Sequence, residues 1–270
     1  MKFTWRNISF AYLLLVPMVA TALAFIVGHV NVLLYIPLWF LNALLMAFMT
    51  SKLIGKVDRT LRTSTWLLIL PWIFIAIFGG MGPPPETAIK WAALSNEQIA
   101  RYTILIISGL LVYKGFYYLH NYLKNKEGDK YSRIGLLLIS LGIPFFIINM
   151  VYWGYFLTYI FATYTAPEST TKPEWVKLLG EAFTLIRMIE VALIYLSTAA
   201  FALALRVSRI LSKGSCIAYV TVACLCSLFN FLPGSVPAPL NVINYLSYIP
   251  AFTLLMPYLI AINILRKQKP

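Results

Sequence analysis

The chain of 270 residues is 60% hydrophobic and only 11% charged, with a formal net charge of +13. Soluble domains are about one quarter charged, so this composition excludes an ordinary soluble protein and predicts an integral membrane protein. The positive charge does not indicate nucleic-acid binding, because the sequence has no basic stripe with interleaved aromatic residues.

Apolar runs follow one another along the whole chain. A bilayer core takes about 20 residues as a helix. This length predicts eight spans, at residues 9–28, 31–51, 65–81, 97–120, 134–163, 178–205, 216–232 and 240–265. No long polar interval separates them, so we predict an all-α helical bundle that forms one membrane domain over residues 1–270.

The first apolar run has features of a secretory signal peptide. It follows a basic start and contains small residues at Ala20 and Ala22, which is typical of a cleavage region. The run continues to Val27, however, and is long enough to span. We therefore interpret it as a retained first helix, with a cleaved signal as the alternative.

The basic residues predict the orientation of the spans. Sixteen of the 22 Lys and Arg residues lie in segments on the same side as the N-terminus, and four lie in the opposite loops, at Lys90, Arg101, Lys172 and Lys177. Because cytoplasmic loops carry an excess of Lys and Arg, both termini are predicted to be cytoplasmic. Anionic lipids at that face are the expected partners. In architecture alone the chain resembles small bacterial inner-membrane proteins, which indicates the plasma (inner) membrane as its location and leaves its function open.

Two outer segments carry local signals. In "GMGPPPETAIKWAALSNEQIARY" the prolines end one span, Trp91 is expected at the membrane interface, and Ser95 with Gln98 has the spacing of a capping box. A later helical pattern runs from Lys172 to Leu211, about 60 Å if unbroken. This length predicts either a break near Gly180 or a helix that projects from the membrane.

The sixth span contains the main candidate site, Arg187 and Glu190. Charged side chains are rare inside a bilayer and usually face a partner or a watery cavity. The two residues are three positions apart, so they share a helix face and can bond each other. One interpretation is an Arg–Glu pair that locks helix packing or is reached by water, and the other is a site where Glu190 binds a cation or a proton.

Other polar residues are also predicted at membrane depth. Lys114 is a third candidate for an intramembrane binding site, although its long side chain can extend to the inner interface. It is not expected to pair with Glu190, which lies at a different depth. Four amides are predicted either to join helices or to line a path, at Asn42, Asn149, Asn230 and Asn244. Prolines interrupt several spans, and broken helices often form transporter binding sites.

The sequence lacks the motifs of familiar membrane enzymes. The only histidines are His29 and His120, and H-E-x-x-H, G-x-S-x-G and phosphate-binding loop patterns are absent. Cys216, Cys224 and Cys226 lie in one apolar run, which favours neither a disulfide framework nor a metal site. We therefore predict no catalytic residue and no cofactor. The favoured function is a permease, a transporter-like protein or a membrane subunit of a transport system. The alternatives are a sensor or scaffold that binds a protein partner, and a lipid-modifying enzyme.

Overall fold

The computed structural model describes residues 5–55, 57–164, 174–233 and 235–267, and these residues form helices joined by turns, with no β-strand among them. The elements are α1 (Trp5–Ala22), the π-helix η1 (Leu23–Val27), α2 (Val32–Leu53), α3 (Arg59–Ile75), α4 (Phe78–Met81), α5 (Ala88–Ala93), α6 (Ser95–Leu123), α7 (Asp129–Val151), the π-helix η2 (Tyr152–Phe156), α8 (Leu157–Tyr164), α9 (Glu174–Val207), α10 (Lys213–Phe229), α11 (Leu240–Tyr248), α12 (Pro250–Thr253) and α13 (Leu255–Lys267). The predicted all-α class is confirmed.

Six helical segments of the described chain are long and apolar enough to cross a membrane. They are Trp5–Val27, Leu33–Leu53, Arg59–Met81, Ser95–Leu123, Asp129–Tyr164 and Glu174–Val207. The seventh predicted span corresponds to α10, which has only 17 residues. The number of crossings therefore depends on α10 and on the last predicted span.

The last predicted span, residues 240–265, is not one straight helix. It divides into Leu240–Tyr248 and Pro250–Lys267, which are bent by 72° to each other. Pro250 has no backbone N–H to donate to the preceding turn, and a residue before proline is driven into an extended conformation. Ile249 has φ −61° and ψ 121°, as this steric effect requires. Pro250 lies inside this predicted span, and in the structure it follows the end of α11 and starts α12.

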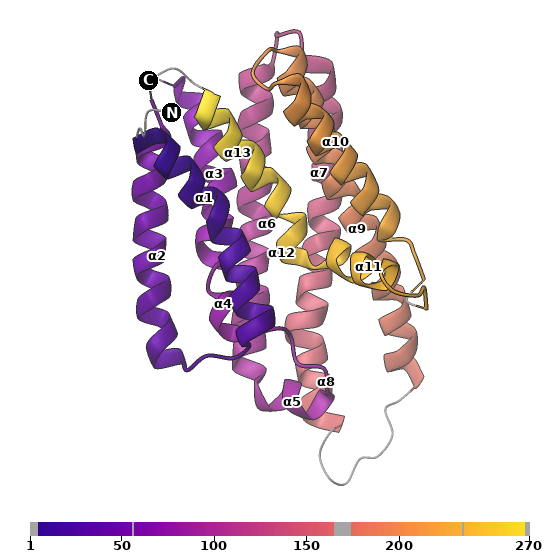
Figure 1. The fold of residues 1–270 in the computed structure, drawn as a ribbon. Helices are drawn as coiled ribbons and strands as arrows, with labels where there is room; N and C mark the ends of the chain where they lie inside the picture. The colour runs from indigo at the N-terminus through magenta and orange to yellow at the C-terminus, as the bar shows by residue number, and fades with distance from the viewer. Residues whose placement is uncertain (1–4, 56, 165–173, 234, 268–270) are drawn as a thin grey trace.

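The long helices form a bundle in which α11 lies across the general helix direction (Figure 1). The start of α1 and the end of α13 lie at the same end of the bundle, where Arg6 Nη2 donates a hydrogen bond of 2.7 Å to Leu265 O. We call the opposite end, which contains α5 and is predicted to face outward, the outer end. The common side of the two chain ends agrees with the predicted topology, and their cytoplasmic placement stays a prediction.

The best-packed parts of the bundle are the α7–α9 and α3–α6 pairs. Small residues let these helices approach closely, as is usual in membranes. Ser197 Oγ donates a 2.7 Å hydrogen bond to Gly135 O between α9 and α7, and Ser64 Oγ donates a 2.8 Å bond to Gly115 O between α3 and α6. In contrast, α2 exposes most of its apolar side chains, as expected for a helix that faces lipid.

The long helix α9 continues through Gly180 without a break, so the predicted interruption there is wrong. Glycine inside a helix costs only about 1 kcal/mol relative to alanine, too little to end a long amphipathic helix. The 34 residues of α9 extend about 51 Å, well beyond a hydrocarbon core of about 30 Å. The remaining expectation, a helix that projects from the membrane, fits this length.

Two local predictions for the outer segment are also wrong. Leu94 is the cap of α6, and Ser95 is already inside the helix, so no capping box forms. Trp91 is buried, with its Nε1 donating a 2.9 Å hydrogen bond to Thr158 Oγ1 of α8. An indole that packs against protein in this way is not an interface anchor. The short helix α5 therefore covers α8, and this contact could not be read from neighbouring residues in the sequence.

Candidate functional site

Glu190 lies in the tightly packed interface between α9 and α7. Its side chain is only 1% exposed, and its Oε1 accepts a hydrogen bond of 2.9 Å from Asn149 Nδ2. Glu190 Oε2 and Asn149 Oδ1 have no hydrogen-bond partner among the described residues. The side chain is therefore held by an amide of the neighbouring helix, which sequence analysis treated separately.

Arg187 does not pair with Glu190. The described residues contain no ion pair between them, and the Arg187 guanidinium instead lies over the Tyr248 ring of α11, 3.7 Å from its centroid. Side chains three residues apart diverge by about 60° around a helix, so Glu190 can face α7 while Arg187 faces α11. The predicted direct pair is wrong. Glu190 contacts α7 and Arg187 contacts α11, so each residue joins α9 to a different helix.

Lys114 faces away from the bundle. Its side chain is exposed, while the neighbouring Gly115 and Phe116 are buried against α3 and α9. Its position fits the interpretation that the lysine extends along the lipid-facing surface to the interface. As predicted, Lys114 and Glu190 form no ion pair within the part of the chain that the structure describes.

The four amides expected at membrane depth all join separate segments, which confirms one of the two roles predicted for them. Asn149 of α7 donates to Glu190 of α9, as described above. Asn42 Oδ1 of α2 accepts a 2.7 Å hydrogen bond from Tyr12 Oη of α1. Asn230 Nδ2 donates to Met188 O of α9 at 2.8 Å, and Asn244 Nδ2 of α11 donates to Phe229 O at 2.7 Å. These bonds attach α10 to α9 and α11 to α10.

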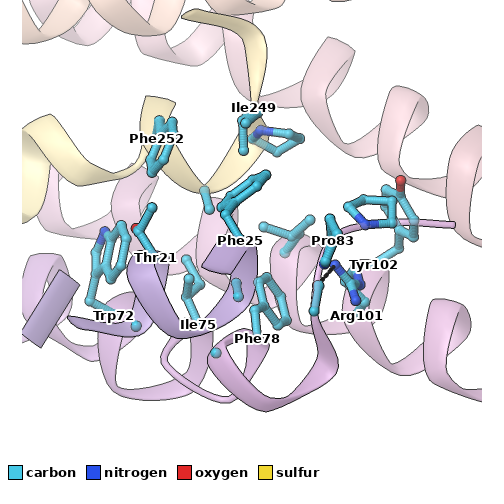
Figure 2. Close-up of a pocket in the computed structure, with 18 residues that line it drawn as sticks. Thr21, Phe25, Trp72, Ile75, Phe78, Pro83, Arg101, Tyr102, Ile249 and Phe252 are labelled. Atoms are coloured by element: carbon cyan, nitrogen blue, oxygen red, sulfur yellow. Dashed lines mark hydrogen bonds between the residues drawn. The ribbon is translucent and has the colours of Figure 1, made fainter. Parts of the chain in front are cut away.

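A cavity of about 80 Å³ lies where the last predicted span breaks. Its walls come from five parts of the chain, namely α1 with η1, the α3–α4 region, the following Gly-Pro segment, α6 and the α11–α12 junction. Figure 2 shows Arg101 and Tyr102 at one end, Trp72 and Thr21 at the other, and Phe25 between them. The space is sufficient for several water molecules or for a small ligand group.

Arg101 is the charged residue in the wall of this cavity, and it is only 5% exposed. Its Nη1 donates to Gly82 O at 3.0 Å, and its Nη2 lies 3.2 Å from Met81 O and 3.3 Å from Glu97 Oε1. The guanidinium also lies over the Phe78 ring, 5.4 Å from its centroid. The Nε group is buried without a hydrogen-bond partner among the described residues. One strong donor of Arg101 is therefore buried beside the cavity without a partner.

The backbone around Arg101 is shaped by glycines. Gly82 has a φ of 68°, a left-handed conformation that suits glycine, and its carbonyl turns toward Arg101. Val30 N donates a 2.9 Å hydrogen bond to Gly80 O, which joins the α1–α2 turn to the end of α4. A side chain on Gly80 would overlap the ring of Tyr35. The close approach of these segments packs the α1–α2 turn against the end of α4.

An acidic and an imidazole side chain complete this outer cluster. Glu97 lies one turn before Arg101 on α6, and its Oε2 is 3.6 Å from His29 Nδ1. His29 Nδ1 is also 3.3 Å from Met81 O. The Arg101 charge is thus largely balanced by Glu97, and the cluster ties α6 to the α1–α2 turn.

Two larger depressions adjoin the cavity. A groove of about 630 Å³ lies between α1 and the α11–α13 region, and it shares Thr21, Phe25 and Phe252 with the cavity. On the outer side, a depression of about 410 Å³ is lined mainly by apolar residues, together with Glu86, Lys90 and His29. It shares Gly82, Pro83 and Pro84 with the cavity. A thin wall therefore separates the cavity from each depression.

The predicted site residues do not come together at this cavity. Glu190, Arg187 and Lys114 line neither the cavity nor its two neighbouring depressions. Arg101 was assigned only to an outer loop, because its burial depends on the α1–α2 turn and on the Gly-Pro segment. A usable signal was Glu97 four residues before Arg101, a spacing that forms ion pairs on a helix.

The fold and its apolar surfaces define a multi-pass helical membrane protein. Within the described ranges, no group of three or more His, Cys, Asp and Glu side chains lies together as metal ligands. No protein-family model, curated protein or solved structure matches the chain.

Proposed function

We propose that the protein is transporter-like and binds a ligand inside the membrane, in the cavity beside Arg101. The supporting observation is the position of a buried arginine with a free Nε donor next to a helix broken at Pro250. Ligand sites in membranes use broken helices because they free backbone groups inside the bilayer. The shared walls with the groove and the outer depression support a route through the protein.

The geometry supports a different site from the one that the sequence indicated. A coupling role of Glu190 requires a cavity or path at that residue, whereas the carboxylate is packed against Asn149. We therefore assign Glu190 and Arg187 to helix packing in this proposal, and Lys114 to the lipid surface. Transport is placed at the Arg101 cavity, either by this protein alone or as the membrane subunit of a larger system.

Two other functions are supported less well. A sensor or scaffold is favoured by the packing of Glu190 and by the length of α9, which provides a surface for a protein partner. A lipid-modifying enzyme requires titratable groups that converge from different segments, and His29 with Glu97 is the pair that fits this condition. No serine, threonine or cysteine lines the two outer depressions that contain His29, so none of these three nucleophiles accompanies the pair there.

The location and lipid partners follow from the same proposal. We place the protein in the plasma (inner) membrane with both termini cytoplasmic, because most basic loops lie on that side. Near this end, Arg266 stacks on Phe10 with 4.4 Å to the ring centroid. Such residues provide contacts for anionic lipid head groups.

Thermal stability measured with candidate ligands tests the proposal. A ligand that binds only the folded protein raises its melting midpoint. In nanodiscs, we expect at least one of acetate, benzoate and dodecanoate to raise the midpoint of the wild type. Ala251→Phe, which fills the cavity wall, is expected to abolish that rise. Ala11→Phe, on an exposed position of α1, is the matched control and should retain it.

Two results would contradict the proposal. One is that none of the three carboxylates changes the midpoint of the wild type. The other is that Ala251→Phe responds to them as fully as Ala11→Phe does, since the ligand would then bind elsewhere.

A further inference from the structure

The cavity beside Arg101 shares part of its wall with the groove between α1 and the α11–α13 region. Thr21, Phe25 and Phe252 belong to the walls of both spaces. From this shared wall we infer that the ligand is a single-chain amphiphile with a carboxylate head, taken sideways from the bilayer. Its head binds at Arg101 and its hydrocarbon tail lies in the groove. This inference rests on the proposed function and adds the substrate class and the route.

The charge balance and size of the cavity favour a small, singly charged head. Arg101 already shares its charge with Glu97, at 3.3 Å, so a multiply charged head would meet unbalanced repulsion from that carboxylate. The remaining Nε donor can give one charge-assisted hydrogen bond to a carboxylate oxygen. A cavity of about 80 Å³ suits such a group better than a bulky phosphodiester head.

The groove has the length and chemistry for a hydrocarbon tail. It extends from Leu14 to Ile26 along α1 and η1, about 18 Å of helix, compared with about 15 Å for the hydrocarbon of one leaflet. The opposite wall comes from α11, α12 and α13 and is also largely apolar, with Leu246, Leu255 and Leu259. An acyl chain in this groove would therefore stay among apolar side chains.

Phe25 occupies the boundary between the two spaces. Its side chain is 43% exposed although it also lines the cavity, and Figure 2 shows its ring in the middle of the cavity view. An aromatic ring on the lipid side can be displaced by a tail without breaking a hydrogen bond. Entry through the outer wall would instead break a hydrogen bond, because Arg101 Nη1 donates to Gly82 O in that wall. Lateral access is therefore easier than access from the outer depression.

Photo-crosslinking distinguishes a lipid source from a water source. The probe is dodecanoate with a diazirine at the end of its tail, added to the full-length protein in nanodiscs, with the labelled peptides identified by mass spectrometry. We expect labels on the groove segments of α1, α11 and α13, with little on lipid-facing α2. Hexadecanoate should compete with the probe, and acetate should not.

Two tryptophan variants at exposed positions of α1 provide a matched comparison between the groove and another surface of the same helix. Met18 lines the groove and is 62% exposed, whereas Leu15 is 53% exposed and lines a different surface, toward α2. Met18→Trp fills the groove and should reduce labelling about tenfold, the effect of roughly 1.4 kcal/mol in binding. Leu15→Trp should label as the wild type does. Arg101→Gln should reduce labelling as well, through loss of the head contact.

Labels spread evenly over α2 and the groove would overturn the inference, and so would equal labelling of Met18→Trp and Leu15→Trp. Competition by acetate as effective as that by hexadecanoate would show a water-soluble ligand, which overturns the lipid route while the proposed function stands. Failure of the proposed function itself is recognised separately, because then no carboxylate raises the melting midpoint of the wild type.

Discussion

Arg101→Gln is expected to produce the largest loss of stability of the substitutions considered. The change removes the donors to Met81 O and Gly82 O and leaves Glu97 without its cation. Removing one member of a buried, hydrogen-bonded charge pair destabilises a protein by about 3 kcal/mol or more. Thermal unfolding in nanodiscs measures the effect, and Arg101→Lys should lie between the variant and the wild type because lysine lacks the planar fork.

Arg133→Gln is the matched control for Arg101. Arg133 also pairs with an acidic residue four positions earlier, Asp129, at 2.7 Å, but its side chain is 66% exposed. An exposed pair contributes little to stability, so this variant should melt close to the wild type. Equal midpoints for Arg101→Gln and Arg133→Gln would contradict the structural role given to Arg101.

Asn149→Leu is expected to have the second-largest effect, a loss of about 2 kcal/mol. The substitution leaves the buried Glu190 carboxylate without its hydrogen bond from α7. Glu190→Gln should behave differently, because its new amide group can donate to Asn149 Oδ1, which is unpartnered in the described structure. That variant should melt at or above the wild-type midpoint and keep ligand binding.

The exposed Glu181 of the same helix provides the control, since Glu181→Gln should leave the midpoint unchanged. A loss of ligand response in Glu190→Gln, with the fold intact, would restore Glu190 as a coupling residue and contradict its assignment to packing. An unchanged midpoint for Asn149→Leu would remove the basis of the packing assignment.

Much of the fold follows from local properties of the sequence. Apolar runs of spanning length predict helices because each backbone polar group must be satisfied within the membrane. Local properties do not predict features that depend on packing between segments far apart in the sequence. Gly180 stays helical within α9, and Trp91 is buried by α8 instead of anchoring at the interface. Prolines were expected to interrupt several spans, but the packing of α11 against α9 and α10 that accompanies the 72° bend at Pro250 was not predictable.

The candidate site was much harder to predict than the fold. Glu190 was found because an acid inside an apolar run is conspicuous, and Asn149 was recognised as a residue that could join helices. Their contact joins residues 41 positions apart, which periodicity does not reveal. Arg101 was predicted as a loop residue. Its burial depends on the turn at His29 and on the carbonyl groups of Met81 and Gly82, which come from other parts of the chain.

The most direct test of the central claim is the chemical accessibility of the Arg101 cavity. Ala24 lines the cavity on η1, and Ala11 lies on the exposed surface of α1. Each is changed to cysteine in a protein whose native Cys216, Cys224 and Cys226 are replaced by serine or alanine. The account predicts that N-ethylmaleimide, which is small and permeates the bilayer, reacts with Ala24→Cys and that dodecanoate slows this reaction, whereas dodecanoate leaves the rate at Ala11→Cys unchanged. A cysteine at position 24 that stays unreactive, or reacts at the same rate with and without dodecanoate, would contradict a ligand site in this cavity.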